Sequence, residues 1–160
     1  MLRTTIDLDA IAHNTRRLRE QTSAELMCVV KADAYNHGVE RCVPVMEAGG
    51  ADAFGVATFA EARRVRELTT KPVLAWLWDP QEELPAGVDV GVPSFTHLQS
   101  LIDAPTAPTA YLKVDTGMHR SGIDEVRWQE AFELALDAQR KGKLTVAGLM
   151  THLSLSLIHI

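Results

Sequence analysis

Cysteine is scarce in this sequence, and the two that occur lack the spacing that a metal site needs. Cys28 lies within an apolar run and Cys42 follows it, with no CxxC pair in the chain. Reduced, buried thiols in a cytosolic protein are the simplest explanation of this pattern. We therefore expect no metal ligands.

Excess positive charge and long apolar runs are missing as well. The formal net charge is −5 at pH 7, whereas nucleic-acid-binding proteins usually carry a basic face. No apolar run approaches the about 20 residues of a membrane-spanning helix, and the start, MLRTTIDLDA, lacks the apolar core of a signal peptide. These absences exclude nucleic acid and membrane as expected partners and favour a cytoplasmic protein.

Strand-like and helix-like segments alternate along the chain, which at 160 residues and 46% hydrophobic content can form one sizeable core. This rhythm predicts repeated βαβ units around a parallel sheet. Helices are expected over residues 5–21 (with Asp9 as N-cap), 40–49, 60–68, 95–103 and 125–141, and strands over 27–31, 53–58, 71–78, 88–94, 110–115 and 144–152.

Two parallel architectures fit this rhythm, a closed (β/α)8 TIM barrel and an open doubly wound sheet. No GxGxxG follows any expected strand, which weakens the dinucleotide-binding alternative. Polar residues gather just beyond the carboxyl ends of strands, where barrel active sites are built. We predict a barrel, present as an incomplete portion of about six βα units, because eight strands and about 250 residues make a whole one.

Lys31 ends the apolar run of residues 27–30 and is followed by a small-residue turn. Strand alternation puts Met27, Val29 and Lys31 on one face. Burial disfavours an ammonium ion, and a neutral amine is the form that condenses with a carbonyl. The plainer alternative is a strand-end lysine that buries its stem and keeps its charge in water.

A second informative stretch is KVDTGMHRSG, residues 113–122. Alternation puts Tyr111, Lys113 and Asp115 on one face, and the turn after Asp115 carries Arg120 over the strand end. A guanidinium there is a permanent planar donor for a carboxylate or phenolate oxygen. The alternative is an ordinary surface arginine on a loop.

Five stretches resemble, in chain order, motifs of alanine racemases, the fold-type III enzymes that use pyridoxal 5'-phosphate (PLP). They are IDLDAIAHN, VVKADAYNHG, FGVAT followed by EA, KVDTGMHRSG and GLMTH. The resemblance covers residues from about 5 to 152 and independently implies a barrel. Asn36 stands where we expect glycine, and Asp33 where many relatives have asparagine.

The resemblance also implies roles for individual residues. Lys31 would carry PLP as a Schiff base and act as one catalytic base, and Tyr35 would contact the cofactor phosphate. Arg120 would bind the cofactor hydroxyl and the substrate carboxylate, Lys113 would be carbamylated so that it orients Arg120, and His152 would lie against the pyridine ring. Without the resemblance, His152 is an ordinary hydrogen-bonded strand-end histidine.

At the level of the whole protein, the resemblance implies interconversion of L- and D-alanine, which supplies D-alanine for peptidoglycan, in a homodimer. The second base, a tyrosine, would come from a C-terminal domain of the partner subunit. Residues 1–152 are expected to be a partial barrel domain of doubtful activity, and residues 153–160, LSLSLIHI, a truncation scar. The alternatives are a non-catalytic PLP-binding barrel, another PLP-dependent racemase or decarboxylase, and a plain α/β fragment without a cofactor.

Overall fold

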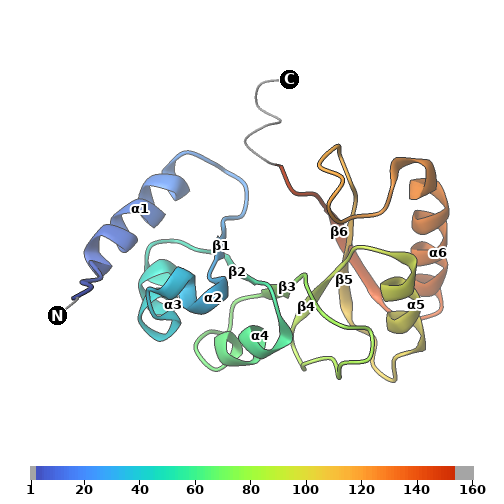
Figure 1. Cartoon of the computed structure of the whole chain (residues 1–160), viewed down its shortest axis with the longest axis horizontal. Coiled ribbons are helices and arrows are strands. Elements are labelled where there is room, and N and C mark those ends of the chain that lie inside the picture. Colours follow the sequence, from blue (N-terminus) through green and yellow to red (C-terminus); the bar gives the residue numbers. More distant parts are fainter. Residues whose placement is uncertain (1–2, 154–160) are drawn as a thin grey trace. The chain divides into compact units, whose positions relative to one another are not determined.

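The computed structural model describes residues 3–153, which divide into two compact units. The first comprises residues 3–75 and 85–88, and the second comprises residues 76–84 and 89–153. Both consist of parallel strands joined by helices (Figure 1). The predicted α/β class is therefore confirmed.

The first unit contains three short parallel strands and four helical segments. Its strands pair in the order β1-β2-β3, with Cys28 opposite Phe54 and Phe54 opposite Val73. Both faces of β2 and β3 are buried, whereas β1 is half-exposed. The elements are α1 (Leu8–Glu20), β1 (Met27–Val29), α2 (Lys31–Asn36), α3 (Val39–Ala48), β2 (Ala53–Val56), α4 (Phe59–Arg66) and β3 (Val73–Ala75).

The N-cap of helix α1 is Asp7 and not Asp9, two residues earlier than the sequence pattern indicated. The Asp7 side chain accepts a hydrogen bond from the Ala10 N–H at 3.0 Å, while Asp9 lies in the first turn. An N-cap needs extended backbone, and Asp7 has it, with φ −93° and ψ 101°. The predicted cap was wrong by two residues.

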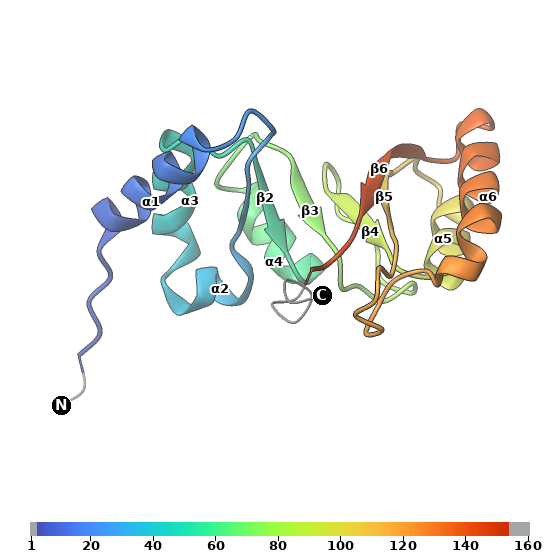
Figure 2. The same ribbon diagram turned by 90° about the horizontal axis from the view of Figure 1, so that it is seen from above.

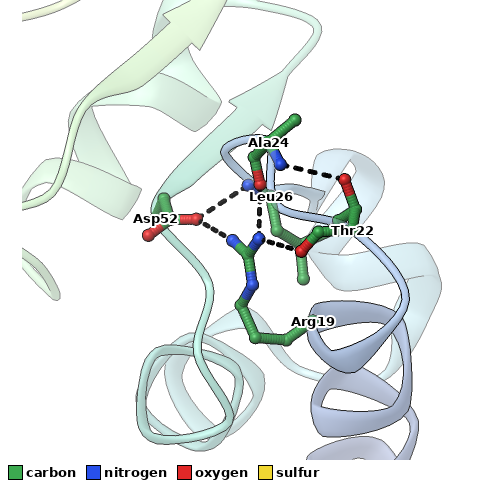
Figure 3. Close-up of polar contacts among 5 residues, drawn as sticks. All are labelled: Arg19, Thr22, Ala24, Leu26 and Asp52. Carbon is green, nitrogen blue, oxygen red and sulfur yellow. Dashed lines mark hydrogen bonds and ion pairs between the residues drawn. The ribbon is translucent and has the colours of Figure 1, made fainter.

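A polar network fixes the loop between α1 and β1 (Figure 3). The Arg19 guanidinium donates to the Asp52 carboxylate and to the carbonyl oxygens of Thr22 and Ala24, each at 2.5 Å. The same Asp52 oxygen accepts the Leu26 N–H at 2.8 Å. Because Asp52 directly precedes β2, the network sets where β1 begins beside its neighbour.

The second unit contains the parallel strands β4, β5 and β6, with a register shift between Ala110 and Tyr111. Helices α5 and α6 lie side by side along one face of these strands (Figure 1, Figure 2). Strand β6 alternates exposed and half-buried residues, so it forms an open edge of the unit. The elements are β4 (Asp89–Val92), α5 (Phe95–Asp103), β5 (Thr109–Lys113), the 3₁₀ helix η1 (Glu125–Arg127), α6 (Trp128–Arg140) and β6 (Thr145–Met150).

Every strand expected from the sequence is present, although each is shorter than predicted. Lys31 is the important difference, because β1 ends at Val29 and Lys31 begins the next segment. Val29, expected on a buried face, is 39% exposed, since β1 pairs with one strand only in its unit. Both cysteines are free, Cys42 buried and Cys28 half-buried. Within residues 3–153 no helix is long and apolar enough to cross a membrane.

Candidate active site

Lys31 lies directly beyond the carboxyl end of β1 in the first unit. The preceding residue, Val30, is buried, and its N–H donates to the Gly55 carbonyl at 2.8 Å, which extends the pairing with β2. The Lys31 side chain is half-buried, and its Nζ lies 5.9 Å from the ring centre of Tyr35. Tyr35 is 55% exposed, so the hydroxyl-bearing ring and the amine share an accessible edge of the unit.

The turn after Lys31 is left-handed, which the sequence did not predict. Five consecutive residues, Ala32 to Asn36, have φ between 50° and 65°. The left-handed conformation costs about 1–2 kcal/mol for each residue that carries a Cβ, so such runs are rare. Asparagine tolerates it better than most, which suits Asn36, and Gly38 follows at φ 88°. Residues with strained backbone conformations are common at functional sites, where contacts with the surrounding structure stabilise them.

The contacts that hold this turn come largely from α4. Glu61 accepts the Ala32 N–H at 2.8 Å. Asp33 accepts the Val39 N–H at 3.0 Å and pairs with Arg64 at 3.1 Å. Glu61 was not among the site residues predicted from the sequence, although the pattern Thr58-x-x-Glu61 is a capping-box signature that marks a carboxylate at the start of a helix.

In the second unit, the segment after β5 is a closed loop. The Ile123 N–H donates to the Lys113 carbonyl at 2.7 Å, and the Asp115 N–H donates to the Ile123 carbonyl at 3.0 Å. Gly122 makes this closure possible, because its φ is 138° and a Cβ there would lie 2.7 Å from the Asp115 nitrogen. Arg120 is exposed on this loop, beyond the carboxyl end of β5 as the sequence predicted.

The carboxylate of Asp115 organises the loop interior. It accepts the N–H groups of Gly117 at 2.9 Å and His119 at 3.1 Å. These two hydrogen bonds, with the nearby His119 ring, hold the pKa of Asp115 below its usual range against a smaller effect of burial. Asp115 is therefore a charged structural group beneath the loop that carries Arg120.

Lys113 is the buried charged residue at the end of β5, with only 6% of its surface exposed. Burial lowers its pKa most, the Arg120 charge lowers it further, and Asp115 opposes both. Burial disfavours the ammonium form, so at a given pH more of this amine is neutral than in an exposed lysine.

His152 follows β6, and its side chain is exposed. The neighbouring Thr151 hydroxyl lies 2.7 Å from that of Thr116, which ties the segment after β6 to the loop after β5. The structure thus brings Lys31 together with Tyr35 in the first unit, and Lys113 with the Arg120 loop in the second. The tail expected at residues 153–160 lies outside the described residues from Ser154 onward.

Parallel βα units, with a lysine directly beyond the first strand and polar loops beyond the later ones, define a barrel-type α/β protein. Comparison with known proteins supports a particular family. The model of the alanine racemase N-terminal domain matches residues 6–157. An alanine racemase of Corynebacterium efficiens is 51% identical over 163 residues, covering 96% of this chain and 44% of that protein.

Solved structures of alanine racemases are also similar to this chain. The crystal structure of alanine racemase from Corynebacterium glutamicum superposes with a TM-score of 0.89 at 45% identity, over 95% of this chain and 46% of that one. The enzyme from the D-cycloserine producer Streptomyces lavendulae gives 0.87 at 32% identity, over 94% and 42%. A racemase from Bartonella henselae, solved with covalently bound pyridoxal phosphate, shares the fold at a TM-score of 0.74 and 23% identity, over 94% and 46%.

The chain belongs to the alanine racemase family, and its fold is an incomplete part of that family's N-terminal (β/α)8 barrel domain. It spans about 44% of the length of the curated relatives it matches. The expected family and fold are therefore confirmed.

Proposed function

We propose that this chain is the cofactor-bearing part of a cytoplasmic, homodimeric alanine racemase, with Lys31 as the residue that holds PLP. The observation that supports this most is the position of Lys31, a half-buried amine beyond a strand end, beside Tyr35 and at the start of a strained turn. In the proposed protein the product, D-alanine, serves peptidoglycan synthesis.

The residues of the first unit fit this cofactor. An aldehyde condenses with a primary amine that it can reach. The Lys31 amine is only half-buried, and it lies 5.9 Å from the ring centre of Tyr35. A phosphate group needs donors, and the exposed Tyr35 hydroxyl is one. When bound, PLP withdraws electron pairs from the α-carbon of an attached amino acid.

The chain's own residues then have separate tasks. Lys31, once released by the substrate, accepts or delivers the α-proton on one face as a general base or acid. Tyr35 binds phosphate, His152 packs against the pyridine ring, and Arg120 orients the substrate carboxylate and the cofactor hydroxyl with its planar fork of donors. Racemisation also needs a base on the opposite face, which we propose comes from a partner subunit of the whole protein.

Lys113 is proposed to be carbamylated. Its lowered pKa leaves more neutral amine, and the amine attacks carbon dioxide to form a carbamate with release of one proton. The product is an anion, which suits a buried site close to the Arg120 charge better than a second cation does.

A chimaeric enzyme, called the graft below, tests the proposed activity. Residues 1–152 of this chain would replace the matching segment of the Corynebacterium efficiens relative, whose 51% identity makes the exchange conservative. We expect the graft to convert L-alanine to D-alanine, and to do so faster than it converts serine or lysine. The 160-residue chain alone is expected to be inactive or nearly so.

Two lysine variants of the graft complete this test. Lys31→Ala should lower kcat by about 10²-fold or more, because it removes a general base. Lys141→Ala, an exposed lysine paired with Asp137 at the end of α6, should keep the parent rate. A Lys31→Ala graft that racemises alanine at the parent rate would refute the proposed role.

A further inference from the structure

Glu61 connects the ends of two neighbouring strands. One of its carboxylate oxygens accepts the Ala32 N–H, which follows β1, at 2.8 Å. The other oxygen accepts two N–H groups that follow β2, from Ala57 at 2.8 Å and from Thr58 at 3.1 Å. A capping box explains the contact with Thr58, since its hydroxyl in turn accepts the Glu61 N–H. It does not explain the contact with Ala32, 29 residues away.

Only an ionised glutamate suits this arrangement. Three N–H donors converge on two oxygens, so both atoms must be acceptors. Glutamine offers one acceptor, and its NH₂ group would face the N–H groups on the other side. Burial tends to raise the pKa of Glu61, but the hydrogen bonds from Ala32, Thr58 and Ala57 and the nearby Lys31 charge together lower it. Glu61 is therefore charged at neutral pH.

The contact between Glu61 and the Ala32 N–H lies at the start of the left-handed turn. Ala32 is the first residue in the left-handed conformation, with φ 50° and ψ 52°, and it directly follows Lys31. The bond from Glu61 therefore fixes the peptide group through which the Lys31 main chain enters the strained turn. In a chain without such contacts, the right-handed alternative is favoured at each of these residues.

Helix α4 holds the turn at a second point, one helical turn later. Arg64, three residues beyond Glu61, pairs with Asp33 within the turn and with Glu40 at the start of α3. Asp33 also accepts the Val39 N–H, the first of α3. Residues three apart share a helix face, so a single face of α4 presents both contacts to the turn.

We propose that Glu61 is a positioning residue for Lys31: its carboxylate clamps the left-handed turn and so fixes the direction in which the Lys31 amine leaves the strand end. This deepens the proposed function and rests on the role assigned there to Lys31. Glu61 itself does not exchange a proton with the substrate, and its effect passes through the Ala32 peptide.

Amide NMR of the 160-residue chain tests the clamp. The Ala32 N–H resonance should titrate with the same midpoint as those of Ala57 and Thr58, below the ordinary pKa of 4.5, because all three report one carboxylate. In Glu61→Gln the Ala32 titration should vanish, and the protection of its amide against hydrogen exchange should fall at least tenfold. Glu67→Gln, which removes the same charge from the end of α4, should change neither.

Two further measurements separate a clamp from a simple helix cap. Thr58→Ala removes the capping hydroxyl and should weaken α4 while the Ala32 titration persists. In the graft loaded with PLP, Glu61→Gln should still be trapped on Lys31 by borohydride, at a condensation rate lowered about tenfold or more, and Glu67→Gln should match the parent.

The possible failures are distinct. Should Glu61→Gln not fold, the wild-type titration decides alone, and an Ala32 midpoint different from those of Ala57 and Thr58 overturns the clamp. Unchanged condensation in a folded Glu61→Gln graft also overturns it. A parent graft that traps PLP on another residue refutes the proposed function instead, whatever the Ala32 amide does.

Discussion

Lys113 and Lys31 are two amines of one chain that lie in different surroundings. Lys113 is buried, and burial together with the nearby Arg120 charge lowers its pKa. Lys31 is half-buried at the start of a strained turn, where Glu61 and Tyr35 lie near it. The first environment suits reaction with carbon dioxide, and the second suits a larger, accessible carbonyl compound.

The proposed carbamylation of Lys113 can be measured directly by NMR. With ¹³C-labelled bicarbonate, the folded chain should give one carbamate carbon resonance, which Lys113→Ala removes and Lys143→Ala, an exposed lysine beyond α6, retains. The signal should weaken as the pH falls, because protonation of the amine competes with the reaction. A folded chain whose Lys113 stays unmodified under carbon dioxide would contradict this prediction.

Among the helices and strands, most positions along the chain were predictable from the sequence. Helix α5 was predicted with its observed bounds, 95–103, because Ser94 caps it and Asp103 ends an amphipathic pattern. The left-handed turn at residues 32–36 was not predicted, because alanine and aspartate give no signal for a conformation that only tertiary contacts hold. Glu61 and Arg64 supply those contacts from 29 or more residues away.

The N-cap of α1 provides a test at this scale. Asp7→Ala should lower the free energy of unfolding by about 1 kcal/mol, because it removes the bond to the Ala10 N–H. Asp9→Ala, in the first turn of the same helix, should cost about 0.5 kcal/mol or less, through the helix dipole alone. Urea unfolding of both variants measures the difference, and equal losses would show that Asp9 shares the capping role.

At the scale of the whole molecule, the sequence predicted the barrel-type order of parallel βα units and the family. It could not predict how far each strand runs, since exposure of β1 and β6 depends on which strands pair with them. It also could not show that Lys31 lies past the end of β1, because an apolar run does not mark its last paired residue.

Acid should destabilise the folded chain. Asp52 has a lowered pKa, first because it accepts the Leu26 N–H and then because Arg19 and Lys71 lie nearby, with burial opposing both. A carboxyl group with a lowered folded pKa contributes stability above its unfolded value of about 3.9, and this contribution is lost as the pH falls through the folded value. Glu61 and Asp115 act in the same direction.

Asp52→Asn isolates one part of this effect. The variant should lower the urea midpoint at pH 7. Its deficit relative to the wild type should begin to shrink as the pH falls below about 4, and it should be smallest below the lowered folded pKa of Asp52, where both side chains are neutral. Glu25→Gln, an exposed position in the same loop, should keep the wild-type urea midpoint at pH 7. If the difference in urea midpoint between Asp52→Asn and the wild type were the same at every pH, the charge of Asp52 would not be the source of its contribution to stability.

Borohydride trapping tests most directly whether Lys31 holds the cofactor. The graft is loaded with PLP, reduced, digested and mapped by mass spectrometry. We predict a single phosphopyridoxyl group on the peptide that contains Lys31, absent from Lys31→Ala and present in Lys141→Ala. A label on any other side chain, or no label on a protein that has bound PLP, would contradict the account.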